Sequence, residues 1–479
     1  MSQTATAIAT APYRSDAAMD TFVRLKESCR REPFIDYKTR RDLLRTIEKI
    51  LLDHDDEICR AISEDFGNRS YYETRILEIT ATLLGIRYTL KRLKRWMKPQ
   101  KRHVSLIFAG GENTVIPQAK GVVGIIAPWN YPLQLSLSPM TSAIAAGNRV
   151  MLKMASNSQN LCRLLHKLFS ERIPEELIAI LPGVGANEFS TLPYDHMVFT
   201  GSPAVGRTIM NNAAPNLTPV TLELGGKSPT ILGEDFDVKT AAARIMYSKL
   251  VNSGQMCVAP DYMFIPEGKV DSFITEAKTI ASRRYPDIMS RDYTSIIDQK
   301  AFDRLVATLE DARSKKAEIV KLLAGEEYNR QARKINPMIF TGVNTDMILM
   351  QDEIFGPFLP ILTYRKVDEV VDYINRHERP LALYVYSHNR RFCDTILRNT
   401  ISGGVTINDC TMHVGQHDMP FGGVGNSGMG QYHAYEGFAE MSKLRPVFRQ
   451  SPVAIALAPP YGRFIERLYG LVRRFRWLS

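Results

Sequence analysis

The chain has 479 residues, of which 44% are hydrophobic, and it carries a formal net charge of +10. This length exceeds what one hydrophobic core usually serves, so we expect two or three domains, and the composition excludes a disordered chain. The charge suits a nucleic-acid-binding protein or an enzyme with anionic ligands. We favour the enzyme and expect no nucleic-acid partner, because no zinc-ligand pattern or RNP-like aromatic motif accompanies the charge.

The first hundred residues are predicted to be helical. Apolar residues recur at helical spacing from Leu43 to Ile62, with charged residues between them. A second helix is predicted from about Tyr72 to Lys98, since Pro99 cannot continue it. Residues 91–102 contain seven basic side chains, which we interpret as a solvated helix end near the negative pole of the helix dipole.

After residue 103, short β-rich runs alternate with helical stretches. The runs predicted as strands are 122–128, 149–155, 178–181 and 196–200, and the helices are 136–147, about 161–169, and one that begins near Pro203. This alternation predicts an α/β fold with a parallel, doubly wound sheet. Ligands of such sheets lie at the carboxyl ends of the strands.

A second α/β unit is predicted to begin near residue 226. Its long helical pattern at 240–255 leads directly into the segment that contains Cys257. Because a new α/β pattern begins there, we place a domain boundary near Gly225 and Gly226.

The segment FTGSPAVG (199–206) follows a predicted strand and opens a helix. Gly201 allows a tight turn, Ser202 can cap the helix and Pro203 suits its first turn, which makes a candidate site for a pyrophosphate. The G-x-x-x-x-G spacing is weak by itself, because it differs from the G-x-G-x-x-G fingerprint and many such turns bind nothing.

Three further residues are candidates, each with a plainer alternative. Cys257 is either a small buried hydrophobe or a nucleophile; its Gly and small polar neighbours suggest an exposed turn whose amides lower the thiol pKa. Glu223 interrupts an apolar strand, and the pattern by itself favours a side chain that faces solvent. Asn130, between two prolines, is either a turn residue or an amide donor to an oxyanion.

Six scattered cysteines without a C-x-x-C pair disfavour a disulfide framework, and we expect no metal site. The N-terminus lacks the basic start and apolar core of a signal peptide. No apolar run approaches the ~20 residues that span a bilayer. We therefore expect a cytoplasmic protein, attached at most to a membrane surface.

Seven motifs, taken together and in order, resemble the aldehyde dehydrogenase superfamily. They are PWNYP (128–132), Lys153 in MLKMAS, FTGSPAVG (199–206), LELGGKSP (222–229), GQMC (254–257), EIFGP (353–357) and PFGGVGNSGMG (420–430). The short N-terminal region resembles the dimeric, class-3-like branch. Within that branch, the segments around Cys257 and residues 417–438 are most similar to bacterial coniferyl aldehyde dehydrogenases.

The resemblance implies a Rossmann-type cofactor domain, an α/β catalytic domain and a small oligomerisation arm. We expect a cofactor domain at 1–225 with an oligomerisation hairpin at about 103–118, a catalytic domain at 226–430, and an oligomerisation strand and amphipathic helix at 431–479. The resemblance to the dimeric branch also implies that the protein forms a homodimer.

The catalytic roles that the resemblance implies involve three residues. Cys257 would be the thiolate nucleophile, Asn130 and the Cys257 N–H would hold the oxyanion, and Glu223 would activate the water that hydrolyses the thioester. The cofactor would be NAD and possibly NADP, and the substrate a small-molecule aldehyde.

The implied cofactor-binding residues follow the strands: Trp129, Lys153, Ser156, Gly201, Ser202, Gly206, Glu353 and Phe355. Lys153 would bind the adenosine ribose, and Ser202 with Gly201 would face the pyrophosphate. Glu353 would hold the nicotinamide ribose, with Phe355 near the ring. Ser156 stands where the family often has a glutamate that repels a 2′-phosphate, so we predict that NADP is tolerated while NAD still works.

The C-terminal segment 461–479 is predicted to form a basic amphipathic helix. We expect it to dock on its own enzyme, near the substrate mouth or the dimer partner, because amphipathic surface helices usually face a core. Weak contact with an anionic membrane surface is the minority alternative.

Two other functions stay open at this point. A thioester-forming acyl transferase would keep Cys257 but has no use for a water-activating base such as Glu223, and a non-catalytic relative would not need Asn130 as well. The resemblance favours a bulky aromatic aldehyde such as coniferyl aldehyde, with long-chain aliphatic aldehydes second.

Overall fold

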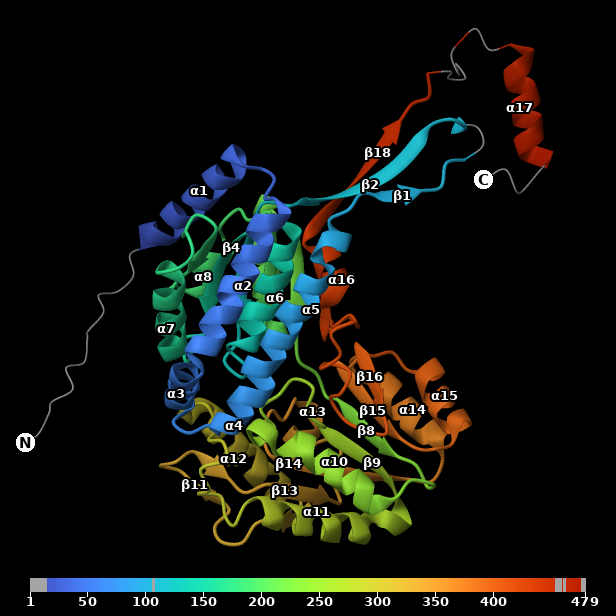
Figure 1. Ribbon diagram of the computed structural model, residues 1–479. Coiled ribbons are helices and arrows are strands. Elements are labelled where there is room, and N and C mark those ends of the chain that lie inside the picture. Colours follow the sequence, from blue (N-terminus) through green and yellow to red (C-terminus); the bar gives the residue numbers. More distant parts are fainter. Residues whose placement is uncertain (1–14, 106–107, 453–458, 460–461, 475–479) are drawn as a thin grey trace, which may run out of the picture.

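The computed structural model describes residues 15–105, 108–452, 459 and 462–474. Two large sheets form the body, and a narrow antiparallel arm projects from it (Figure 1). The N-terminal helices are α1 (Ser15–Arg31), α2 (Tyr37–Asp53) and α3 (Asp55–Phe66). The predicted second helix is present as α4 (Tyr71–Glu73), a π-helical segment (Thr74–Thr80) and α5 (Ala81–Trp96). It ends two residues before the predicted Lys98.

The first sheet has six strands in the order β17-β7-β6-β3-β4-β5. Five are parallel: β3 (Val122–Ala127), β4 (Arg149–Met154), β5 (Ile178–Ile180), β6 (His196–Thr200) and β7 (Val220–Glu223). They alternate with α6 (Gln134–Ala146), α7 (Gln159–Ser170), α8 (Ala186–Ser190) and α9 (Pro203–Ala213). The predicted doubly wound sheet is confirmed, and a late segment, β17 (Gly428–Met429), returns to pair antiparallel with β7.

Helices cover both faces of this sheet. Val123 and Ile125 belong to the core that includes α2, α3, α5, α6 and α7, whereas Val122 and Ile126 pack with α1, α8 and α9. Successive side chains of a strand point to opposite faces, so a strand covered on both sides is apolar throughout. This explains why all six residues of β3 are buried.

The second sheet has seven strands in the order β10-β13-β14-β9-β8-β15-β16. They are β8 (Pro229–Leu232), β9 (Tyr262–Pro266), β10 (Glu318–Lys321), β13 (Met338–Thr341), β14 (Phe358–Tyr364), β15 (Ala382–Tyr386) and β16 (Gly404–Ile407). All pairs are parallel except β10 with β13 at the edge. The covering helices are α10 (Val238–Leu250), α11 (Val270–Arg284), α12 (Gln299–Ser314), α14 (Val367–Arg376) and α15 (Arg390–Asn399).

The boundary predicted near residue 225 falls between β7 of the first sheet and β8 of the second. One continuous apolar core runs from the helices of the first sheet to α10 and α11 beneath the second. The two sheets therefore meet along a buried junction, and the chain crosses it directly after Glu223.

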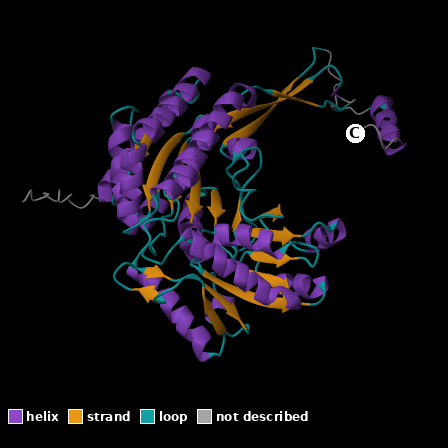
Figure 2. Cartoon of the chain, turned by 60° about the horizontal axis from the view of Figure 1, so that its bottom comes forward, coloured by secondary structure: helices purple, strands orange, loops and turns teal. Residues whose placement is uncertain are grey.

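The arm consists of β1 (Gln100–Arg102), β2 (Glu112–Ala119) and β18 (Ser442–Arg449), all antiparallel. Of the hairpin expected at about 103–118, β2 lies within those bounds except for Ala119, whereas β1 lies just before them. The last helix, α17 (Arg463–Arg474), lies beyond the far end of the arm, away from the body (Figures 1 and 2). In this single chain, the described part of the C-terminal segment does not reach the body.

No helix among the described residues combines the length and the apolar character needed to cross a membrane.

Candidate active site

Glu223 ends β7 at the carboxyl edge of the first sheet, where β17 pairs with it. Its side chain is 2% exposed, and neither carboxylate oxygen has a hydrogen-bond partner among the described residues. Burial raises the pKa of Glu223 well above its usual value. The solvent-facing interpretation is wrong because the side chain lies inside the junction, close enough to Cys257 and Tyr432 for its charge to raise the pKa values of both. An unpaired buried carboxylate is costly and is a candidate functional group.

Cys257 follows α10 through a tight 3-10 turn, Val251–Gly254. Asn252 and Ser253 both adopt a left-handed backbone with φ of 51°, and Gly254 has φ of 73°. A Cβ on Gly254 would lie 2.2 Å from the carbonyl oxygen of Gly356, so the loop packs closely against the EIFGP segment. Residues 252–255 are buried and Cys257 is half-buried. The expectation of an exposed turn is therefore wrong, because the EIFGP segment and the Asn130 loop pack against these residues.

The thiol of Cys257 lies in a desolvated and negatively charged environment. Burial, followed by the nearby carboxylates of Glu353 and Glu223, raises its pKa to about 12. The backbone N–H groups of Cys257 and Val258 act in the opposite direction without offsetting this rise. The lowered thiol pKa expected from the sequence is wrong for the chain by itself, since burial and like charge both disfavour a thiolate.

Asn130 lies between β3 and α6 and is 3% exposed. Its Nδ2 donates to the carbonyl oxygen of Gln255 at 3.3 Å, two residues before Cys257. An amide nitrogen carries two N–H bonds, so one proton stays available for a ligand oxygen. The structure thus brings the Asn130 amide, the Cys257 thiol and the Glu223 carboxylate to one junction from three separate segments.

Cys257 forms part of the wall of a cavity of about 440 Å³. The rest of the lining is largely aromatic and aliphatic and includes Leu84, Tyr88, Tyr131 and Phe421. Cavities of this size and character hold small organic ligands. The Cys257 residue therefore lies in the wall of a cavity that an apolar small molecule can enter.

The anion-binding features predicted after the strands of the first sheet lie on α9 and β4. Ser202 caps α9 directly after Gly201, and its side chain accepts from the Val205 N–H at 3.5 Å. Gly206 packs closely against Leu224, leaving no room for a side chain. Lys153 in β4 is 8% exposed and burial lowers its pKa, yet its ammonium has no hydrogen-bond partner within the described part of the chain. A buried cation in one parallel strand and a helix N-terminus after another strand of the same sheet fit the hydroxyls and phosphates of a dinucleotide.

The EIFGP segment closes the other side of the junction. The Glu353 carboxylate lies directly over Gly225, where a Cβ would be 2.1 Å from Oε2. Burial, with a smaller effect of Asp261, raises the pKa of Glu353 to about 8. Phe355 has φ of 46°, and its ring meets Trp129 edge to face at 5.3 Å. Ser156 lies in an exposed turn after β4. Gly225 thus leaves the space that the Glu353 carboxylate occupies.

Comparison with known proteins agrees with this arrangement. The family described as "Aldehyde dehydrogenase family" matches residues 3–447. The chain belongs to the aldehyde dehydrogenase family. It is 43% identical to a probable coniferyl aldehyde dehydrogenase of Pseudomonas aeruginosa, over 93% of this chain and 94% of that relative. It is 42% identical to a coniferyl aldehyde dehydrogenase of Pseudomonas sp. strain HR199, over 88% and 89%.

Among solved structures, the substrate-bound state of Staphylococcus aureus AldH has a TM-score of 0.89 and 33% identity, covering 95% of this chain and 99% of that chain. An NAD complex of PnpE, with a TM-score of 0.84 over 93% of this chain and 92% of that chain, is 22% identical and shares the fold. The aldehyde dehydrogenase described here oxidises aldehydes with NAD(P) as the acceptor.

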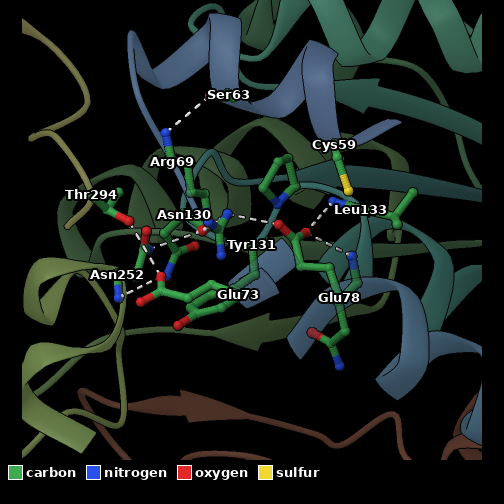
Figure 3. Close-up of polar contacts among 12 residues, drawn as sticks. Cys59, Ser63, Arg69, Glu73, Glu78, Asn130, Tyr131, Leu133, Asn252 and Thr294 are labelled. Atoms are coloured by element: carbon green, nitrogen blue, oxygen red, sulfur yellow. Dashed lines mark hydrogen bonds and ion pairs between the residues drawn. The ribbon is translucent and has the colours of Figure 1, made fainter. Parts of the chain in front are cut away.

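Sequence patterns missed one group of residues in this aldehyde dehydrogenase. Arg69, Glu73 and Glu78 lie beside the loops of Asn130 and Cys257, joined to them by hydrogen bonds (Figure 3). The one signal in the sequence is Glu78, a charge between Leu77 and Ile79 within an apolar helical stripe. Arg69 and Glu73 occupy ordinary positions in a charged helical region and give no such signal.

Proposed function

We propose that this aldehyde dehydrogenase oxidises bulky aromatic aldehydes of the coniferyl aldehyde class to the corresponding acids. The observation that carries the proposal is the apolar, aromatic-lined cavity of about 440 Å³ with Cys257 in its wall. An aromatic ring gains free energy by leaving water for such a wall, while its aldehyde stays directed at the sulfur. The names of the relatives at 42–43% identity support the same substrate class.

In the proposed mechanism, the Cys257 thiol loses its proton to water, which is the one proton released in the cycle, and the sulfur adds to the carbonyl carbon of the aldehyde. The developing oxyanion accepts hydrogen bonds from the free Asn130 amide proton and the Cys257 N–H, which hold it as its charge grows. NAD(P), when bound, supplies the acceptor for the hydride that leaves this carbon. A thioester on Cys257 remains.

Glu223 completes the proposed cycle as a base. Its buried carboxylate has no other partner among the described residues, so it is available to take a proton from water as the water attacks the thioester. The products are the acid, free Cys257 and one released proton. A water-activating base argues against an acyl transferase, which would pass the acyl group to a thiol.

The cofactor roles are part of the same proposal. Lys153 would bind the adenosine ribose, Gly201 and Ser202 would face the pyrophosphate, and Gly206 would allow α9 to approach. Glu353 would hold the nicotinamide ribose. The remaining contacts are Ser156 near the adenosine ribose, and Trp129 and Phe355 beside the ring.

We also infer three domains as the sequence predicts: residues 1–225 bind the cofactor, 226–430 carry the nucleophile, and 431–479 with the hairpin support a homodimer. The projecting arm supports this, because Leu444 and Phe448 of β18 are 37% and 46% exposed. Sedimentation equilibrium of the full chain tests it, and a monomer would contradict it. Fractionation of cells tests the expected cytoplasmic location, and retention of liposome binding after deletion of 461–479 would dismiss membrane contact through that segment.

The test of substrate class is a panel of aldehydes ranked by kcat/KM from NAD(P)H absorbance, with and without coenzyme A. Coniferyl aldehyde should exceed acetaldehyde and long-chain aliphatic aldehydes. Exposed apolar residues near the cavity, Ile76 at 60% and Leu84 at 47%, favour long-chain aldehydes as the second candidate. A long-chain aldehyde ranked first would overturn the aromatic proposal, and dependence on coenzyme A would overturn hydrolysis.

A further inference from the structure

Three charged side chains of the N-terminal helical region lie beside the two catalytic loops (Figure 3). Arg69 and Glu78 form an ion pair of 2.7 Å, and neither side chain is exposed to solvent. Burial raises the pKa of Glu73 to about 7. Buried charges are costly unless their partners are fixed, so their contacts indicate which parts of the chain they hold.

Glu78 holds the loop that carries Asn130. Its Oε1 accepts from Arg69, and its Oε2 accepts from the backbone N–H of Leu133 at 2.7 Å and of Gln134 at 3.2 Å. These two N–H groups belong to the first turn of α6, which has no side-chain cap of its own. A carboxylate at a helix N-terminus is favoured by the helix dipole, so Glu78 fixes where the loop enters α6.

Arg69 holds the same loop from the other side. Its Nη1 donates to the carbonyl oxygen of Asn130 at 3.0 Å as well as to Glu78. The guanidinium lies 5.0 Å from the ring centre of Phe66 and 4.8 Å from that of Tyr131, the residue after Asn130. Its Nε and Nη2 have no hydrogen-bond partner among the described residues, so its position depends on these few contacts.

Glu73 holds the loop that carries Cys257. Its Oε2 accepts from the backbone N–H of Asn252 at 3.0 Å and from the Thr294 hydroxyl at 3.2 Å. Asn252 is in the left-handed backbone conformation, which is uncommon for residues other than glycine although asparagine adopts it more readily than most. Its Nδ2 then donates to the carbonyl oxygens of Asn130 at 3.2 Å and Gln255 at 3.0 Å.

The Asn130 carbonyl is therefore the point where both loops are joined. It accepts from Arg69, which is paired with Glu78, and from Asn252, which is held by Glu73. We propose that Arg69, Glu73 and Glu78 are positioning residues that fix the oxyanion donor relative to the nucleophile. The proposal rests on the roles assigned above to Asn130 and Cys257.

If these residues position the loops, their substitution should lower kcat more than an equally destabilising substitution elsewhere in the chain does. Arg69→Met alone leaves Glu78 buried and unpaired, so the double variant R69M/E78Q removes both charges while glutamine keeps an oxygen for the Leu133 N–H. A displacement of 1 Å can cost about 10²-fold in rate. We expect kcat of R69M/E78Q to fall roughly 10- to 100-fold, with a smaller change in KM for the aldehyde.

Arg149→Met is the matched control. Arg149 is 1% exposed and donates to the Ser28 hydroxyl at 3.2 Å and the Ser28 carbonyl at 3.1 Å. It begins β4, at the opposite edge of the sheet from the carboxyl ends where Asn130 and Glu223 lie. R149M should lose stability in urea as readily as R69M/E78Q but keep kcat within about twofold of wild type.

Glu73 offers a second test that needs no paired substitution. Glu73→Gln keeps an oxygen that can accept from the Asn252 N–H, whereas Glu73→Ala removes it. E73A should lower kcat about tenfold or more and change the rate at which iodoacetamide alkylates Cys257, measured by mass spectrometry; E73Q should restore most of both. R69M/E78Q should leave the alkylation rate nearly unchanged, because alkylation does not use the oxyanion donor.

The outcomes separate this proposal from the proposed function. If N130A and C257A lose activity but R69M/E78Q and E73A keep kcat within twofold, the network does not position the loops. Equal losses of kcat in R149M and R69M/E78Q would overturn it too, as would equal kcat values for E73A and E73Q. If N130A or C257A stays fully active, the assigned roles are wrong and the network proposal fails with them. Should R69M/E78Q not fold by circular dichroism, the Glu73 pair decides.

Discussion

Two regions meet at the Cys257 sulfur, and their walls differ in polarity. The proposed substrate side is the apolar cavity lined by residues such as Tyr88 and Phe421. The opposite side presents two buried carboxylates, Glu223 and Glu353, whose pKa values are raised by burial. The contrast teaches that substrate choice depends on shape and apolar burial, whereas the chemistry depends on a few charges kept out of water.

The proposed cofactor side also presents charged groups that are buried. The Lys153 ammonium is buried without a hydrogen-bond partner among the described residues, and α9 presents its N-terminus after Gly201. Low effective dielectric strengthens the interactions of such groups with a charged ligand. Four substitutions test the proposed roles of these regions, in order of decreasing expected effect.

Glu223→Gln should give the largest effect. The glutamine amide cannot take a proton from water, so hydrolysis of the thioester slows and steady-state kcat should fall by about 10²- to 10⁴-fold. Formation of the thioester does not need this base, so a burst of one NAD(P)H per active site should remain. Stopped-flow absorbance measures both phases, and loss of the burst together with kcat would assign Glu223 to an earlier step.

Ala81→Trp acts on the apolar side alone. Ala81 is half-buried in the cavity wall at the start of α5, and an indole there reduces the space for a large substrate. We expect kcat/KM for coniferyl aldehyde to fall roughly 10- to 100-fold. Acetaldehyde on the same variant is the control and should change little. Equal losses for both aldehydes would mean that the cavity does not select the substrate.

Ser156→Glu acts on the cofactor side. Wild-type enzyme should accept NADP with more than about one percent of its kcat/KM for NAD, a difference below roughly 2.7 kcal/mol. A glutamate in this exposed turn would repel a 2′-phosphate, so the ratio of NADP to NAD activity should fall about tenfold. Initial rates with both cofactors measure the ratio. An unchanged ratio would place the adenosine ribose away from residue 156.

Glu353→Gln should give the smallest effect, an increase in the reactivity of the free Cys257 thiol whose size depends on pH. With a pKa of about 8, Glu353 is mostly neutral at pH 6.5 and charged at pH 9. Its charge raises the Cys257 pKa, so the glutamine should lower that pKa and increase the thiolate fraction at pH 9 only. We expect alkylation by iodoacetamide to speed up about 2- to 5-fold at pH 9 and to stay unchanged at pH 6.5. A slower reaction at pH 9 would contradict this electrostatic account.

Sequence patterns recovered much of the fold and the candidate residues. The strands that became β3, β4 and β6 were predicted within one residue at each end, because a run buried on both faces is apolar throughout. Asn130 and Cys257 were found because each directly follows a regular element and lies in a motif of the family.

The environments of these residues were predicted less well. The local pattern by itself favoured a solvent-facing Glu223 and an exposed turn with a lowered thiol pKa at Cys257, and both interpretations are wrong. The burial of Glu223 and the charge of Glu353 near Cys257 depend on segments that are distant along the chain, and no local pattern reports them.

The sequence by itself determined the α/β class, the order of the elements and the family. Local periodicity shows which segments form helices and strands, and the motifs identify the family by their order along the chain. Only the tertiary structure decided the direction in which the pKa of the Cys257 thiol shifts. It also decided that the Glu223 carboxylate has no hydrogen-bond partner among the described residues and that both loops are joined at the Asn130 carbonyl. The reason is physical: desolvation and Coulomb interactions depend on distance through space, which the order of residues along the chain does not state.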